Sequence, residues 1–155
     1  MDINALHIEQ LPQNAPIPYH LLLLADETVE SIDRYIFASK IYGVKENEKL
    51  IAAYALCMLN KNMVEVKNIA VAKEFQGKGI GTLLLQDAEV RAKAEGFKSL
   101  IIGTGDSSFQ QIKLYKRLGF EEFDVKRNFF FHNYPYPIVE NGIMLRDMIM
   151  FKKDL

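Results

Sequence analysis

The chain has 155 residues, of which 49% are hydrophobic and 25% are charged, a composition typical of one folded domain with a full core. Nineteen Lys and Arg against twenty Asp and Glu give a net charge of -1, which argues against a nucleic-acid partner because such proteins usually carry a basic excess. A single cysteine, Cys57, excludes an internal disulfide framework and a multi-cysteine metal site. No apolar run approaches the roughly 20 residues of a membrane span, so we expect a cytoplasmic protein with no membrane partner and one domain over residues 1–155.

The hydrophobic pattern predicts an alternation of strands and helices. The first half predicts a strand, a helical region broken near Asp26, a strand and a β-hairpin; in chain order these are Ile3 to Leu11, Tyr19 to Phe37, Lys40 to Val44, Leu50 to Leu59 and Met63 to Val71. The second half predicts helix, strand, helix and two closing strands; these are Ile80 to Glu95, Ser99 to Ile102, Ser107 to Leu118, Phe120 to Phe131 and Ile143 to Lys152. This order predicts a mixed α+β fold.

The clearest predicted helix is the one that begins at Ile80. Asp87 with Arg91 and Glu89 with Lys93 are spaced as i,i+4 ion pairs in the favourable order. Gly96 follows the last periodic residue and is expected to end the helix in the left-handed conformation. Gly119 is expected to end the second helix in the same way, and Asp106 or Ser107 is expected to cap its beginning.

A glycine-rich turn, Gln76-Gly77-Lys78-Gly79-Ile80-Gly81, joins a predicted strand to this helix. Glycines at alternate positions leave backbone N–H groups exposed at a helix N-terminus, where they can converge on a phosphate or pyrophosphate. Lys78 would add a screened positive charge. The spacing fits neither the P-loop nor the Rossmann glycine pattern. A glycine turn without a ligand is the alternative interpretation.

The turn resembles the acetyl-CoA signature of the GNAT N-acetyltransferases, Gln/Arg-x-x-Gly-x-Gly/Ala. The strand Asn68 to Val71 stands before it as in the family, and the block Leu114 to Phe120 resembles the family's Tyr followed by Gly-Phe. The resemblance covers Leu50 to Phe123. It implies a GNAT-like acyl-CoA N-acyltransferase fold, with a mixed central sheet of about seven strands flanked by about four helices, as one N-acetyltransferase domain.

The resemblance implies that acetyl-CoA is the co-substrate and lies in a V-shaped cleft between two splayed strands. Ile69 and Val71 would pair with the pantetheine arm through their main chain. A β-bulge near Asn68 would aim a backbone N–H at the thioester carbonyl. The family often carries Asn where this chain has Asp106-Ser107-Ser108, so that Ser107 or Ser108 would donate to the cofactor instead. The pyrophosphate would be held by the amides of Gln76, Gly77, Lys78, Gly79, Ile80, Gly81 and Thr82.

The resemblance also implies catalytic roles for two side chains. Glu65 stands where many members carry the general base, and Tyr115 stands where they carry the general acid for the CoA thiolate. The alternatives are a solvent-facing strand carboxylate and a core tyrosine. His132 or water are alternative bases. No metal is implied.

The resemblance therefore implies an N-acetyltransferase that moves an acetyl group from acetyl-CoA directly to a primary amine of a small molecule or peptide. The alternative is a non-catalytic acyl-CoA binding or sensing module. The acceptor site is expected between residues 19–37 and 131–142, where the aromatic residues 129–136 line the pocket or form core and a dimer face. The sequence leaves open whether the protein is a monomer or a homodimer.

Overall fold

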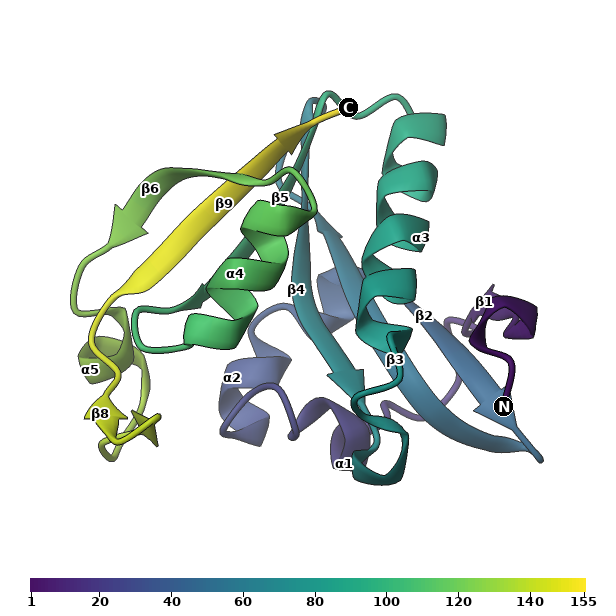
Figure 1. The fold of residues 1–155 in the computed structure, drawn as a ribbon, viewed down its shortest axis with the longest axis horizontal. Helices are drawn as coiled ribbons and strands as arrows, with labels where there is room; N and C mark the ends of the chain where they lie inside the picture. The colour runs from purple at the N-terminus through teal and green to yellow at the C-terminus, as the bar shows by residue number, and fades with distance from the viewer.

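The computed structural model describes residues 1–155, and seven strands form one mixed sheet in the order β1-β2-β3-β4-β5-β9-β6 (Figure 1). Only β4 and β5 run parallel; all other neighbours are antiparallel. A separate hairpin holds β7 and β8. The strands are β1 Ile8–Gln10, β2 Ser39–Glu46, β3 Lys49–Met58, β4 Met63–Val71, β5 Ser99–Gly105, β6 Glu121–Lys126, β7 Val139–Glu140, β8 Ile143–Met144 and β9 Met148–Asp154.

Helices cover both faces of this sheet. They are α1 Tyr19–Leu22, α2 Val29–Asp33, α3 Ile80–Ala94, α4 Phe109–Arg117 and α5 Phe129–Asn133, with 3₁₀ turns at Ile3–Ala5, Ile36–Ala38 and Lys73–Phe75. Leu84 of α3 and Tyr115 of α4 share the largest core cluster with Val66 of β4. Leu22 of α1 packs with Ala55 in a separate cluster. None of the helices combines the length and the apolar character that crossing a membrane requires.

The predicted α+β fold and its seven-stranded sheet are confirmed. The hairpin of β3 and β4 and helix α3 lie where the sequence predicted them. Gly96 and Gly119 follow α3 and α4 with φ of +90° and +95°, as expected of helix-ending glycines. Arg91 Nε lies 2.7 Å from Asp87 Oδ2.

Glu89 departs from its predicted partner. Its carboxylate pairs with Lys153 Nζ at 3.0 Å and not with Lys93. Lys153 also donates to the Leu118 carbonyl at 2.7 Å. Solvent screens this half-buried tertiary pair less than an exposed pair along the helix. Glu89 therefore pairs with Lys153 in preference to Lys93.

Several predicted boundaries are wrong. The first strand shrinks to β1 because residues 3–5 form a 3₁₀ turn capped by Asp2. The predicted strand to Phe131 ends at Lys126, where Asn128 takes φ +55° and opens α5. The last strand begins at Met148, since β8 belongs to the separate hairpin. The N-cap residue of α4 is Ser108, one or two residues later than expected.

The parallel pair β4 and β5 parts midway, and this divergence positions the site. Their register runs from Met63 opposite Ser99 to Val66 opposite Ile102 and then stops. Beyond that point β4 stays with β3, while β5 stays with β9. Figure 1 shows the two strands separating. The half of β4 that follows Val66 therefore has one edge without a strand neighbour.

Candidate active site

The glycine-rich turn leads from β4 into the N-terminus of α3. Gly77 and Gly79 have φ of +76° and +87°, which side chains rarely tolerate, and Gly79 is the N-cap residue of α3. The first helical bond runs from Leu83 N–H to the Gly79 carbonyl. The N–H groups of residues 80–82 therefore have no acceptor within the helix, and they add to the positive end of its dipole.

Gly81 lies inside the first turn of α3, where its conformation does not require glycine. A Cβ built on it would meet no atom of the protein within 4 Å. Glycine in a helix costs roughly 0.5–1 kcal/mol relative to alanine. No packing inside the protein accounts for this cost, and the open space beside Gly81 leaves room for a ligand next to the first turn of α3.

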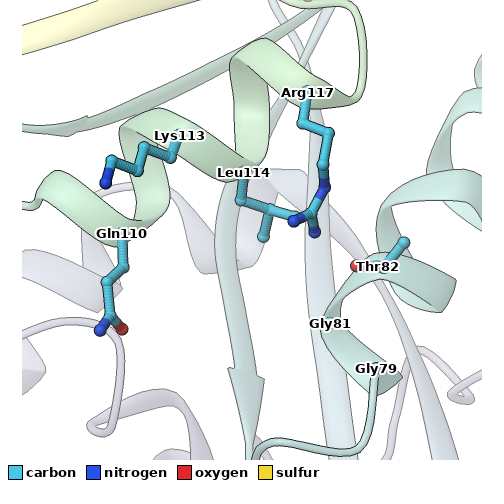
Figure 2. A pocket seen from close by; sticks show the side chains of 7 residues that line it. All are labelled: Gly79, Gly81, Thr82, Gln110, Lys113, Leu114 and Arg117. Carbon is cyan, nitrogen blue, oxygen red and sulfur yellow. The ribbon is translucent and has the colours of Figure 1, made fainter.

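A groove of about 410 Å³ lies between this turn and α4 (Figure 2). Its lining includes two cations, Lys113 and Arg117, and no acidic residue. The Arg117 side chain extends from α4 toward the first turn of α3. Cations facing a helix N-terminus make an anion site. The lining residues are Gly79, Gly81, Thr82, Gln110, Lys113, Leu114 and Arg117.

The α4 side of this groove was missed from the sequence. Gln110, Lys113 and Arg117 recur at i, i+3 and i+7, so they share one face of α4. That spacing was the available signal. Lys78, in contrast, lies over the Phe75 ring at 5.8 Å and does not line the groove.

The free edge of β4 carries the two residues expected to meet pantetheine. Ala72 N–H donates to the Ile51 carbonyl of β3 at 2.8 Å. Because main-chain groups alternate along a strand, those of Ile69 and Val71 face the opposite edge, where β5 is absent. The Val71 carbonyl accepts from Gln76 Nε2 at 2.9 Å, which ties the turn to the strand.

The β-bulge expected near Asn68 is present. Asn68 pairs with Ala55 and Val66 with Leu56, which leaves Lys67 without an opposite residue. The bulge lies where the pairing of β4 with β5 has just ended. Asn68 is buried, and its Nδ2 donates to the Leu22 carbonyl at 3.0 Å and to Tyr35 Oη at 3.1 Å.

Tyr115 is 5% exposed and packs edge-on against Phe151, with ring centroids 5.6 Å apart. Burial, together with the negative charge of Glu140, raises the pKa of the Tyr115 phenol well above its ordinary value. No hydrogen bond within the protein stabilises either form of the hydroxyl. The phenol therefore stays protonated at neutral pH, and its proton is not donated to any acceptor within the protein.

Glu65 is buried, so the alternative of a solvent-facing strand carboxylate is wrong. Its side chain is 8% exposed and lies 3.3 Å from Lys67 Nζ. Val64 and Val66 face the core shared with Tyr115, and alternation therefore turns Glu65 to the other face of the sheet. The two proposed catalytic side chains thus lie on opposite faces beside the point where β4 and β5 part.

The remaining predicted residues have other partners. Ser107 is buried, and its Oγ donates to the Ile143 carbonyl at 3.3 Å. Ser108 Oγ bonds Glu140, while Asp106 accepts from the Arg146 N–H at 3.1 Å. These contacts hold the loop before α4 against the β8 region. His132 is exposed on α5.

A network of hydroxyls around Asp26 joins α1 and α2 to the segment after α5. Asp26 accepts from Tyr134 Oη at 2.6 Å, Tyr35 Oη at 3.0 Å and Ser31 Oγ at 3.0 Å. Burial and the neighbouring carboxylate raise the pKa of Tyr35 and of Tyr134, so both remain donors. We call these four residues the Asp26 network. Tyr35 connects it to Asn68 at the bulge.

Residues 5–120 match the model of the acetyltransferase (GNAT) family. The chain belongs to this family. It is 37% identical over the full length of both chains to an uncharacterized N-acetyltransferase, YvbK, of Bacillus subtilis. A GNAT family acetyltransferase of Elizabethkingia anophelis, crystallised with acetyl-CoA, is 45% identical, with 97% and 98% of the two chains covered and a TM-score of 0.93. A Bacillus subtilis acetyltransferase in complex with CoA is 37% identical, with 97% and 99% covered and a TM-score of 0.88.

The protein is therefore an acetyltransferase that uses acetyl-CoA as co-substrate. Its residues fit that group. The space beside Gly81, the amides of the α3 N-terminus and the cations of α4 suit a pyrophosphate. The free edge of β4 suits an extended arm with amide groups.

Proposed function

We propose that this GNAT acetyltransferase transfers the acetyl group directly to a primary amine of a small molecule or peptide, with Glu65 as general base and Tyr115 as general acid. The bound acetyl-CoA supplies an activated acyl group on a thiol leaving group. The protein supplies position and proton transfer.

The donor half of the proposed site uses main-chain atoms. The N–H groups from Gly77 to Thr82 hold the pyrophosphate, with Lys113 and Arg117 opposite. Gln76, which we also expected to contribute its amide, instead donates its N–H to the Lys73 carbonyl at 3.3 Å. Ile69 and Val71 pair with the pantetheine arm along the free edge of β4. The bulge at Lys67 turns a backbone N–H toward the thioester carbonyl, where it stabilises developing negative charge. The Ser107 hydroxyl donates to the Ile143 carbonyl, so this residue holds the loop before α4.

Glu65 removes a proton from the acceptor ammonium, directly or through water, because an ammonium has no lone pair for attack. Its position on the α1 and α2 side supports an acceptor site between α1, α2 and the segment after α5. The Asp26 network borders that space. Exposure and the lack of a side-chain partner make His132 the weaker candidate for the base.

Tyr115 protonates the departing thiolate from the opposite face. Its raised pKa keeps the proton available throughout the neutral range. A module that only bound acyl-CoA would need the glycine turn and the groove beside it. It would need neither the buried Glu65 nor the free Tyr115 hydroxyl. Their placement beside the divergence of β4 and β5 therefore supports the enzyme.

The open space beside Gly81, facing Lys113 and Arg117, carries the donor assignment. Thermal unfolding with acetyl-CoA, CoA, ATP and NAD in parallel tests it. A ligand at about 100 times its Kd adds roughly 2.7 kcal/mol, which corresponds to about 5–10 °C for a chain of this size. We expect the shift with acetyl-CoA and CoA alone. No shift with either CoA compound would contradict the assignment.

A screen of primary amines then tests the acceptor class. Release of free CoA thiol, measured with a thiol reagent, should depend on both acetyl-CoA and amine. An amine panel should include amino acids, polyamines and short peptides. Continuous thiol release, beyond one equivalent per chain, that is equally fast without any added amine would reject transfer to these acceptors.

A further inference from the structure

Lys67 brings a primary amine of the chain itself against the proposed base. Its Nζ lies 3.3 Å from Glu65 Oε1 and 5.9 Å from the centre of the Tyr35 ring. Glu65 has no other cationic partner. Lys67 is also the bulged residue of β4, directly after the last residue that pairs with β5. The amine therefore lies at the point where the two strands part.

The Lys67 ammonium is weakly held for a cation in this position. It has three N–H donors and contacts one carboxylate oxygen at 3.3 Å. Among the lysines in ion pairs, Lys153 has an equally low side-chain exposure. It has two close acceptors, Glu89 at 3.0 Å and the Leu118 carbonyl at 2.7 Å. Lys67 retains 26% exposure. Its flexible side chain is therefore free to swing within the site.

We propose that Lys67 is a self-acetylation site, to which the enzyme transfers the acetyl group when no external amine is present. This inference rests on the proposed function, because it uses Glu65 as base and the bulge as the thioester position. The same contact that would orient an acceptor amine already orients Lys67 Nζ.

The step balances without any further reactant. The bond from Lys67 Nζ to the acetyl carbon forms, and the bond from that carbon to sulfur breaks. The ammonium gives up two protons in total. One proton of the ammonium passes to Glu65 and from there to water. The CoA thiolate takes a proton from the Tyr115 hydroxyl, and the second proton of the ammonium returns to Tyr115 through solvent. The products are an N-acetylated Lys67 and free CoA thiol.

Acetylation would change the charge of the acceptor side. An amide at Lys67 has no positive charge, so Glu65 would lose its ion pair and the Tyr35 ring its cation. The modified chain would therefore present a more negative acceptor site than the unmodified chain.

The test incubates the full chain with acetyl-CoA alone and follows each lysine by peptide mass spectrometry. Lys40 is the internal control, because it pairs with Glu95 at 2.9 Å on the α3 side of the sheet and reports the chemical background. We expect Lys67 to be acetylated at least about tenfold faster than Lys40. The rate per chain should not depend on protein concentration, since the reaction is intramolecular. An acceptor amine should suppress it.

Glu65→Gln should slow Lys67 acetylation by about tenfold or more while leaving Lys40 unchanged. Its folding is checked by the thermal shift with CoA; if it does not fold, Tyr115→Phe replaces it. Acetylation of Lys67 no faster than of Lys40, or equal rates in both variants and the parent chain, would overturn the inference. If external amines are acetylated while Lys67 stays unmodified, the self-acetylation site is rejected and the proposed function stands. If neither is acetylated, both fail.

Discussion

The free hydroxyl of Tyr115 makes a specific kinetic prediction. Tyr115→Phe removes the proposed proton donor and leaves the ring packing with Phe151 in place. We expect kcat to fall by up to about 100-fold, because general acid catalysis contributes roughly that much, with the Kd of acetyl-CoA almost unchanged.

Phe120→Leu is the matched control, since Phe120 contacts the Tyr115 ring in the same cluster and carries no proton. It should lower stability and leave kcat nearly unchanged. A Tyr115→Phe variant with full turnover would remove the acid role from this residue.

Gly81 makes a prediction at the scale of helix α3. Gly81→Ala should raise the free energy of unfolding by about 0.5–1 kcal/mol, because the helix gains a better helix former and the new Cβ meets no protein atom. Gly81→Val should leave the free chain at least as stable and weaken CoA binding by tenfold or more, because its branches enter the groove. Urea unfolding of the free chains measures their stability, and calorimetric titration with CoA measures the affinity. Equal CoA affinity in the parent and the valine variant would show that the space beside Gly81 is not the ligand site.

The contact between α2 and the segment after α5 carries a second element-scale prediction. Tyr134→Phe removes the hydrogen bond to Asp26 and should lower the free energy of unfolding by about 1.5–3 kcal/mol, as expected for a bond to a charged acceptor. It should raise KM for the amine and not change the Kd of acetyl-CoA, since Tyr134 does not line the groove. Urea unfolding and steady-state kinetics measure these quantities.

Tyr136→Phe provides the comparison for that variant. The Tyr136 hydroxyl is exposed and contacts the Glu27 carbonyl at 3.4 Å, so its loss should have little effect on stability. If both variants lose the same stability, the Asp26 network has no special part in joining these segments.

At the scale of the whole molecule, buried tyrosines make stability depend on pH above the ordinary phenol pKa. Burial raises the pKa of Tyr35, Tyr54, Tyr115 and Tyr134. A raised pKa in the folded state gives stability that is complete below about pH 10 and is lost as pH rises, because the unfolded chain releases its protons first. Each such group contributes a slope of up to about 1.4 kcal/mol per pH unit.

Tyr54→Phe tests this dependence. Tyr54 is fully buried and donates to Asp87 Oδ2 at 2.6 Å. The free energy of unfolding, measured in urea at about pH 8, 10 and 11, should fall less steeply above pH 10 in the variant than in the parent chain. Parallel curves would show that Tyr54 titrates alike in the folded and unfolded states.

The donor half of the site was predictable because its signals are local. Glycines at 77, 79 and 81 and the apolar repeat of α3 lie within one stretch of chain. The resemblance added the proposed roles of Glu65 and Tyr115, which stay predictions. The burial of Glu65 was not foreseen, because strand alternation alone does not tell which face is covered.

The sequence analysis named the segments of the proposed acceptor half, residues 19–37 and 131–142, but not the pairs of residues that join them, because these contacts link distant parts of the chain. Tyr134 reaches Asp26 across 108 positions, and no local pattern marks either residue as a partner. The triple Phe129-Phe130-Phe131 favours a strand by propensity. It forms α5 instead because Asn128 turns the chain and Phe130 packs with Ile138 and Leu145 in a small core of its own.

The edge of β4 that β5 leaves free has a consequence for how specificity can evolve. In the proposed function, recognition along that edge and at the glycine turn uses peptide groups, which a point mutation of most side chains leaves in place. The Asp26 network uses four side chains, each replaceable by a single codon change. A library randomised at Asp26, Ser31, Tyr35 and Tyr134 should therefore yield enzymes that keep the acyl donor and exchange the amine.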